Sequence, residues 1–102
     1  MSNSLKEQII NDIESNNIIL YMKGTKEMPM CGFSATVIKV LSMYSIVFKD
    51  INVLEDPNIR IQLSEYSNWP TIPQLFVKGE LIGGCDIVLE LHNSNVLEKI
   101  LS

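Results

Sequence analysis

The sequence has too few cysteines, too few basic residues and no apolar run long enough for several common classes of protein. Its 102 residues include two cysteines and one histidine, which are too few for a closed structural zinc site within one chain. Eight basic against twelve acidic residues give a net charge of −4. This charge argues against nucleic acid as the main partner, because binding phosphates needs a basic face. No apolar stretch approaches the roughly 20 residues of a membrane span.

The first 17 residues also lack the features of a targeting segment. They carry Glu7, Asp12 and Glu14, and they have neither an apolar central stretch nor an arginine-rich stripe. We therefore expect a cytoplasmic protein. In that compartment Cys31 and Cys85 would not form a structural disulfide by default.

The pattern of apolar and turn residues predicts a single α/β domain over residues 1–102, and 46% apolar residues are enough for a core. In the first half of the chain we predict a helix opened by a capping box at Ser4, a buried strand over 18–22, a polar loop over 23–30, a helix from Gly32 to about Tyr44 that buries Phe33, and a strand over 46–53. In the second half we predict a helix capped by Asp56 and two hairpin strands over 74–77 and 80–82. A helix capped by Asp86 that ends near His92 follows, and then a last helix over 95–101 capped by Ser94.

This order predicts a four-stranded mixed sheet with helices on both faces. The first two strands are separated by a helix and are expected to be parallel, whereas the last two form an antiparallel hairpin. Ligands of open α/β sheets bind beyond the carboxyl ends of the strands. Cys31 follows the first strand by one loop and so falls at that edge.

Cys31 is the residue with the clearest chemical role. It opens the run Cys31-Gly32-Phe33-Ser34 just before a predicted helix, where unpaired backbone N–H groups and the positive end of the dipole favour a thiolate. Ser34 stands where a redox pair would carry its second cysteine, so the site offers one thiolate. A lone cysteine is otherwise often a buried apolar residue, but the glycine-containing, helix-opening context favours a functional thiol.

Two cations are candidates to accompany Cys31. Lys23 follows the first predicted strand, at the same sheet edge, where its charge would stabilise a thiolate or pair with a carboxylate. Without further context, Lys23 is equally well a solvated lysine at the end of a strand. Arg60 lies on the helix after Pro57, and the sequence alone favours an ordinary surface arginine there.

Two loops complete the candidate site. Thr71-Ile72-Pro73 is either a plain turn between helix and strand or a loop that presents backbone groups to a ligand. The sequence does not tell whether the bond before Pro73 is cis. Gly83-Gly84-Cys85-Asp86 opens a helix whose N–H groups suit a carboxylate, and Asp86 is otherwise simply a helix cap.

Together these blocks resemble the monothiol glutaredoxins of the thioredoxin superfamily, of the short single-domain bacterial type. The resemblance rests on four runs in family order, which span essentially the whole chain: Met22-Lys23-Gly24-Thr25, Cys31-Gly32-Phe33-Ser34, Trp69-Pro70-Thr71-Ile72-Pro73-Gln74 and Gly83-Gly84-Cys85-Asp86. One departure is Met30, at a position where a small polar residue is common in the family. The resemblance implies a thioredoxin-like fold and a glutathione site.

In that resemblance, each candidate residue has a part in holding glutathione. It implies that Lys23 and Arg60 contact the tripeptide, Arg60 at the glycyl carboxylate, that the loop Thr71, Ile72 and Pro73 faces its cysteinyl part, and that Gly84, the Cys85 backbone and Asp86 hold its γ-glutamyl end. Cys31 would be both the nucleophile and the metal ligand. Trp69 and Phe33 are expected to pack and support the loops.

Two functions of different classes are compatible with such a site. The first is an iron–sulfur carrier, in which two copies and two glutathione thiolates supply the four thiolates of one [2Fe–2S] cluster for transfer to apo-proteins. The resemblance implies a homodimer, in which a BolA-type protein can replace one subunit. The second is reduction of glutathione mixed disulfides through Cys31 alone, with at most weak activity. A bare interaction module with an inert thiol is a third reading. Glutathione binding does not separate the first two, since both need it.

Overall fold

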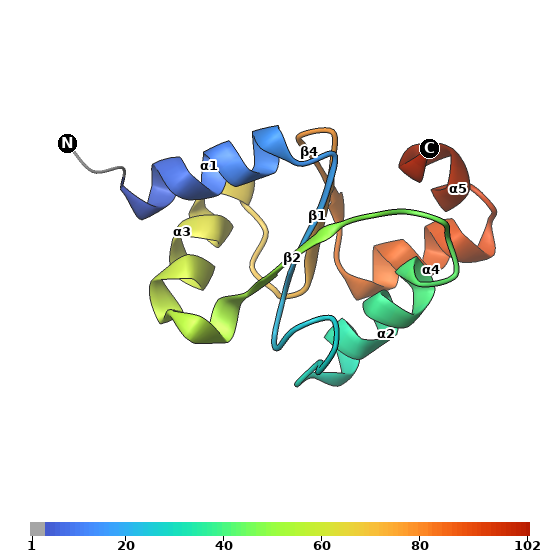
Figure 1. The fold of residues 1–102 in the computed structure, drawn as a ribbon, viewed down its shortest axis with the longest axis horizontal. Helices are drawn as coiled ribbons and strands as arrows, with labels where there is room; N and C mark the ends of the chain where they lie inside the picture. Colours follow the sequence, from blue (N-terminus) through green and yellow to red (C-terminus); the bar gives the residue numbers. More distant parts are fainter. Residues whose placement is uncertain (1–3) are drawn as a thin grey trace.

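The computed structural model describes residues 4–102 and places one four-stranded sheet between two layers of helices (Figure 1). The elements in chain order are α1 (Leu5–Ser15), β1 (Ile18–Met22), α2 (Gly32–Leu41), β2 (Lys49–Asn52), the 3₁₀ turn η1 (Val53–Glu55), α3 (Pro57–Ser67), β3 (Gln74–Val77), β4 (Glu80–Gly83), α4 (Cys85–Asn93) and α5 (Leu97–Leu101). The strand order is β2-β1-β3-β4, with β1 and β2 parallel and the other pairs antiparallel. The predicted mixed sheet is confirmed.

Strand β1 is shared by two hydrophobic cores, which explains why all five of its residues are apolar and buried. Ile18, Leu20 and Met22 face the layer of α2, α4 and α5, whereas Ile19 and Tyr21 face the layer of α1 and α3. Successive side chains of a strand point to opposite faces, so a strand covered on both sides has no position for a polar residue. Figure 1 shows the two layers on either side of the sheet.

Two helices begin where the sequence predicts. The Ser4 hydroxyl accepts the Glu7 N–H at 3.1 Å, and the Glu7 carboxylate accepts the Ser4 N–H at 3.0 Å, which completes the capping box. The Asp56 carboxylate accepts the Asn58 N–H at 2.9 Å at the start of α3, whose first residue is Pro57.

The connection between α2 and β2 is longer than predicted. Helix α2 ends at Leu41 rather than near Tyr44, and β2 begins at Lys49 rather than Ile46. The Tyr44 hydroxyl lies 2.6 Å from Nδ1 of His92 on α4, and Ile46 packs against the core. These side chains are therefore anchored by tertiary contacts without belonging to a helix or strand, a distinction that apolar spacing does not make.

Two predicted helix caps are wrong. Helix α4 takes Gly84 as its N-cap, so Asp86 lies inside the first turn and makes no cap hydrogen bond. Helix α5 begins at Leu97 with Val96 as its N-cap, whereas Ser94 ends α4. No helix within residues 4–102 is both long and apolar enough to span a bilayer.

Candidate functional site

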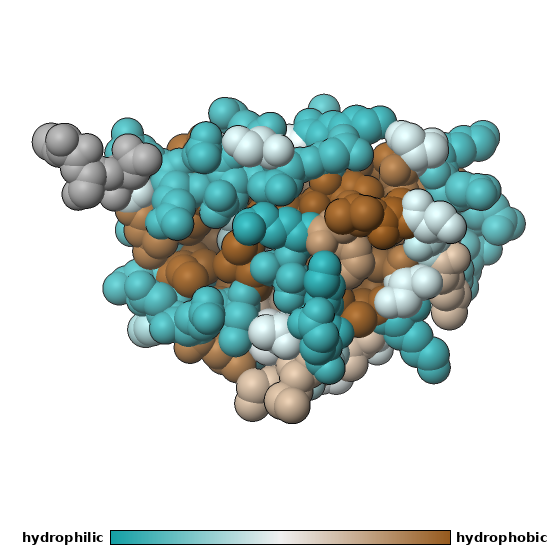
Figure 2. All heavy atoms as spheres, viewed as in Figure 1, coloured by the Kyte–Doolittle hydropathy of each residue, from teal (hydrophilic) through white to brown (hydrophobic). Residues whose placement is uncertain are grey.

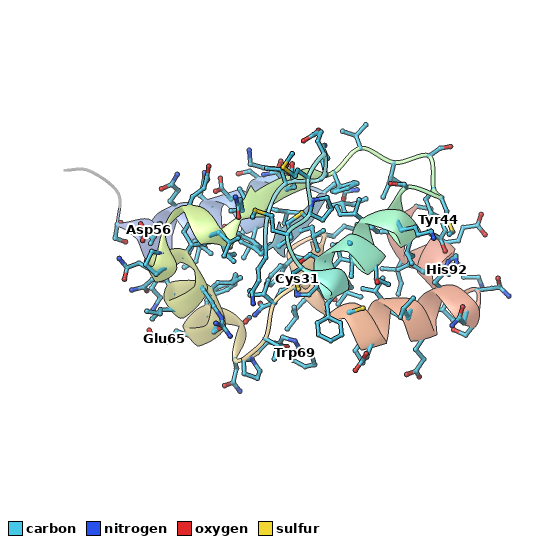
Figure 3. All side chains as sticks on the ribbon, turned by 90° about the horizontal axis from the view of Figure 1, so that it is seen from below. Cys31, Tyr44, Asp56, Glu65, Trp69 and His92 are labelled. Atoms are coloured by element: carbon cyan, nitrogen blue, oxygen red, sulfur yellow. The ribbon has the colours of Figure 1, made fainter. Side chains whose placement is uncertain are left out.

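Cys31 lies at the start of α2, at the edge of the sheet where β1 ends, as predicted. It is the N-cap residue of the helix and is half-buried. In Figure 3 it lies near the middle of the molecule, between α2 and the loop that carries Trp69, and far from the Tyr44–His92 pair. As a thiol, Cys31 makes no cap hydrogen bond within residues 4–102. The first-turn N–H groups of α2 therefore remain available to a thiolate.

These N–H groups hold the pKa of the Cys31 thiol below its usual value of 9.0. The backbone N–H of Ser34 has the largest effect, partial burial opposes it, and the Phe33 N–H, the Ser34 hydroxyl and the charge of Lys23 lower the pKa further. Donors that stabilise the ionised form favour it over the neutral form. The site therefore carries a thiol that ionises more readily than an ordinary cysteine.

Ser34 has a structural task of its own. Its side chain is fully buried, and its hydroxyl accepts a hydrogen bond of 3.1 Å from the backbone N–H of Lys23. The bond joins the first turn of α2 to the residue that follows β1. The second cysteine of the chain, Cys85, is the first residue of α4 and is not disulfide-bonded to Cys31.

The loop between β1 and α2 is held by polar contacts to β2. The side-chain oxygen of Asn52 accepts the N–H groups of Gly24 and Leu54, both at 2.9 Å. The Lys26 N–H donates to Asp50 at 2.9 Å, and its ammonium donates to the Phe48 carbonyl at 3.0 Å. Gly24 has a φ of +92°, and a Cβ there would clash with the Met28 carbonyl oxygen, so this turn requires glycine.

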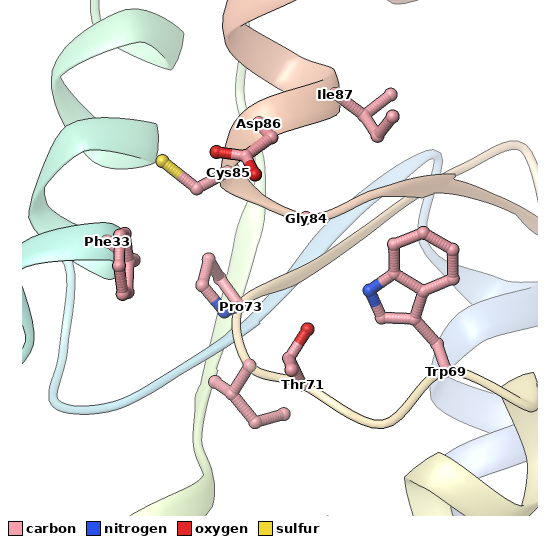
Figure 4. Close-up of a pocket in the computed structure, with 9 residues that line it drawn as sticks. Phe33, Trp69, Thr71, Pro73, Gly84, Cys85, Asp86 and Ile87 are labelled. Carbon is pink, nitrogen blue, oxygen red and sulfur yellow. The ribbon is translucent and has the colours of Figure 1, made fainter.

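A first hollow of about 250 Å³ lies between the loop before β3 and the start of α4 (Figure 4). It is lined by Phe33, Trp69, Thr71, Ile72, Pro73, Gly84, Cys85, Asp86 and Ile87. The Ile72–Pro73 peptide bond is cis, which the sequence left open. The buried amide of Gln74 fixes the loop by donating to the carbonyl oxygens of Trp69 and Thr71, at 2.9 and 3.1 Å.

The start of α4 supplies the polar groups of this hollow. No side chain of residues 4–102 caps the helix, so its first N–H groups, from Cys85 onward, have no partner within it. The Asp86 carboxylate is exposed at the same wall. Burial raises the pKa of the Cys85 thiol, and the nearby charges of Asp86 and Cys31 raise it further. Cys85 is therefore the less ionised of the two thiols.

A second hollow of about 400 Å³ contains the two predicted cations. Lys23 and Arg60 stand over an apolar floor formed by Val53, Leu54, Pro57 and Ile61. Of the residues that line it, only these two are charged, so the hollow suits an anionic group with an apolar stem. Arg60 is exposed on α3, and Lys23 is half-buried. The charge of Lys23 also reaches the sulfur of Cys31.

The residues predicted to hold the ligand thus fall into two hollows rather than one, and Cys31 is not among the residues that line either hollow. Thr71, Ile72, Pro73, Gly84, Cys85 and Asp86 line the first, whereas Lys23 and Arg60 line the second. The sequence missed Ile87 in the first hollow and the four apolar residues in the floor of the second. Phe33 and Trp69, predicted as packing and support residues, line the first hollow, and Phe33 is 62% exposed rather than buried. The position of Phe33 two residues after Cys31, in the first turn of α2, was the one available signal.

Residues 18–82 match the family model described as Glutaredoxin, which covers more than half of the chain. This chain belongs to the glutaredoxin family. It is 54% identical over 95 residues, covering 93% of this chain and 91% of the relative, to a probable monothiol glutaredoxin 2 from Rickettsia felis. This glutaredoxin is accordingly of the monothiol type, as the resemblance implied.

Solved structures confirm the thioredoxin-like fold of this glutaredoxin. The solution structure of reduced apo GrxS14 from poplar superposes with a TM-score of 0.82 at 44% identity, covering 94% of this chain and 88% of that one. A buckwheat glutaredoxin, solved as a complex with glutathione, superposes with a TM-score of 0.84 over 95% of this chain and 86% of that one. At 24% identity the second comparison shows the fold alone.

Three large apolar side chains are exposed around Cys31 of this glutaredoxin. Met28, Met30 and Phe33 are each more than 60% exposed on the loop before α2 and its first turn. In Figure 2, moderately hydrophobic residues gather at the lower edge of the molecule, over this part of the chain. Thioether and aromatic side chains adapt well to varied apolar partners.

Proposed function

We propose that this glutaredoxin binds glutathione across the two hollows, and that two copies hold one [2Fe–2S] cluster between them for delivery to apo-proteins. The position of Cys31 carries the proposal. A readily ionised thiol lies at the head of α2, with the cations Lys23 and Arg60 in one hollow and the start of α4 with Asp86 in the other. The cytoplasmic location stays a prediction.

The charges of glutathione complement those of the two hollows. The tripeptide has a carboxylate at its glycyl end, and a carboxylate beside an ammonium at its γ-glutamyl end. Lys23 and Arg60 would pair with the glycyl carboxylate, and the N–H groups at the start of α4 would bind the other carboxylate. Asp86 would accept from the ammonium. The loop Thr71, Ile72 and Pro73 would lie along the cysteinyl part, which brings its thiol toward Cys31.

The cluster is the cargo in this proposal, and its four thiolates come from four molecules. One chain offers Cys31, and no group of three or more cysteine, histidine or acidic side chains within residues 4–102 is arranged to hold a metal ion. Two chains and two glutathiones meet the count of four thiolates. A homodimer is one arrangement, and a BolA-type protein in place of one copy is another. Because the two glutathione thiolates can dissociate, the cluster would be held loosely, which suits a carrier that must release its cluster.

The lowered pKa of Cys31 also favours a second function, glutathione-dependent disulfide reduction. The Cys31 thiolate would attack the glutathione sulfur of a mixed disulfide, form a Cys31–glutathione disulfide and release the protein thiolate. The thiolate of a second glutathione would then attack that disulfide, which yields oxidised glutathione and restores Cys31. This route uses one thiol and no metal, and we expect at most weak activity.

Anaerobic reconstitution with iron, sulfide and glutathione separates the two functions. A carrier gives a coloured species of dimeric mass by size exclusion, which forms only with glutathione and becomes a colourless monomer when the cluster is lost. Cys31→Ser should abolish the colour while circular dichroism and the melting temperature stay native. If Cys31→Ser still gives the coloured species, Cys31 is not a ligand of the cluster. A colourless wild-type monomer under all conditions would leave disulfide reduction as the function.

A further inference from the structure

The indole N–H of Trp69 is a buried hydrogen-bond donor without a partner. Trp69 is the only tryptophan of the chain, and its ring lines the first hollow. Its Nε1 atom is shielded from solvent, and no acceptor within residues 4–102 receives its proton. A buried indole N–H usually finds a partner, because an unmade hydrogen bond costs free energy. The missing acceptor is therefore expected on a ligand.

The loop does not need this N–H for its own structure. Gln74 already holds the backbone of the loop through the carbonyl oxygens of Trp69 and Thr71, and the Trp69 backbone N–H donates to the Ser67 hydroxyl at 3.2 Å. The donor is thus spare, and Figure 4 shows the indole nitrogen turned into the hollow, toward Gly84 and Pro73.

The donor also lies next to the uncapped start of α4. A Cβ on Gly84, the N-cap residue, would lie 3.5 Å from Trp69 Nε1 and 3.1 Å from the Pro73 carbonyl oxygen. The indole nitrogen therefore lies beside the residue at which α4 begins. An indole nitrogen only donates, whereas the nearby Asp86 carboxylate only accepts. The ligand must present an acceptor to Trp69 and a donor to Asp86.

We propose that the indole N–H of Trp69 donates to the α-carboxylate at the γ-glutamyl end of the bound tripeptide, and so makes the hollow specific for a carboxylate beside an ammonium. The inference rests on glutathione being the ligand, as in the proposed function. Trp69 becomes a specificity-determining residue with a hydrogen-bonding role beyond packing. A hydrogen bond to a charged group is worth about tenfold or more in affinity.

Calorimetric titration with two ligands tests this assignment. One ligand is glutathione, and the other is 4-aminobutanoyl-cysteinylglycine, which lacks only the α-carboxylate. Trp69→Phe keeps an aromatic ring and should weaken glutathione binding about tenfold. The same variant should leave binding of the decarboxylated ligand unchanged. The matched control is Tyr66→Phe, which removes a polar group from an aromatic ring outside both hollows and should change neither affinity.

The single tryptophan allows a second measurement on the unaltered chain. Its one indole ¹⁵N–¹H resonance should shift on adding glutathione and stay in place with the decarboxylated ligand. An equal loss of both affinities in Trp69→Phe, or an equal shift with both ligands, would overturn the assignment in favour of ring packing. If the wild-type chain binds glutathione and Trp69→Phe binds it with the same affinity, the role of Trp69 is overturned but the proposed function is not. Failure of the wild-type chain to bind glutathione would overturn the proposed function as well.

Discussion

The hydroxyl of Ser34 accepts a hydrogen bond from the backbone N–H of Lys23 across 3.1 Å. The side chain that stands in place of a second thiol therefore ties the helix of the nucleophile to the residue that carries a predicted ligand-binding charge. The same hydroxyl also helps to lower the pKa of Cys31. One buried serine thus connects the fold, the thiolate and the cation.

Ser34→Cys should destabilise the fold rather than simply create a dithiol site. A thiol is a weak acceptor, so the part-buried Lys23 N–H would lose its partner, and unfolding in urea should require about 1–3 kcal/mol less. Ser34→Ala should behave alike. Ser15→Ala, at an exposed serine on α1, is the control and should stay within about 0.5 kcal/mol of wild type. A Ser34→Cys chain as stable as wild type would contradict this role.

The alkylation rate of Cys31 should rise at a pH below that of an ordinary cysteine. Its pKa lies below 9.0 in the folded chain, so the thiolate forms earlier as pH increases. The rate with iodoacetamide, measured in a Cys85→Ser background, should reach half its maximum below pH 9.0. Cys31→Ser supplies the background rate. A half-maximum at or above that pH would show that the donors of α2 do not act on the sulfur.

The same depressed pKa has a consequence for stability. A group with a lower pKa in the folded state stabilises that state above its unfolded pKa, and this contribution is lost as pH falls through the folded value. The stability of wild type relative to Cys31→Ser should therefore increase between the folded pKa and pH 9.0. Urea unfolding of both chains over this range checks the sign. A difference that shrinks with rising pH would be inconsistent with a stabilised thiolate.

Lys23→Ala and Arg60→Ala should each weaken glutathione binding. Each removes one cation from the second hollow, and an exposed charge pair is worth about fivefold in affinity. Lys39→Ala, at an exposed lysine on α2 outside both hollows, should have little effect. Glutathione monoethyl ester, blocked at the glycyl carboxylate, should bind wild type more weakly than free glutathione does. This difference should shrink in Lys23→Ala and disappear in the double variant Lys23→Ala/Arg60→Ala. If the ester and free glutathione bind wild type equally, these cations do not hold that carboxylate.

Asp50→Ala should loosen the loop before α2 without unfolding the protein. It removes the acceptor of the Lys26 N–H and the partner of its ammonium, 4.0 Å away. Amide hydrogen exchange at Lys26 should accelerate, while the amide of Gly24, held by Asn52, keeps its protection. Glu65→Ala on α3 is a control for loss of a surface carboxylate. Unchanged exchange at Lys26 would mean that Asp50 does not fix the loop.

The sequence predicted those parts of the fold that depend on local rules. The capping box at Ser4, the Asp56 cap and the buried run of β1 all follow from spacing and residue type, and the structure confirms them. Helix ends were less accurate, because tertiary contacts decide them. Tyr44 has the helical spacing of a core residue and packs against the core, but it lies beyond the end of α2, where its hydroxyl contacts His92.

The site was predictable in its residues but less so in its arrangement. Helical spacing puts Phe33 on the same side of α2 as the buried Val37. The first turn of α2 nevertheless lies at the rim of the first hollow, and the Phe33 side chain stays exposed there. The separation of Lys23 and Arg60 from the start of α4 depends on how α3 and α4 pack on opposite faces of the sheet. A one-dimensional pattern does not contain that information.

The double burial of β1 limits how the chain can change in length. A deletion or insertion of one residue within Ile18–Met22 would exchange the side chains of the two cores, so that Tyr21 would have to fit where Leu20 or Met22 now packs. The following loop, held by side-chain contacts to Asp50 and Asn52, lies outside both cores. Insertions and deletions among descendants of this gene should therefore accumulate in the loop and spare the strand, even though the loop follows the strand directly.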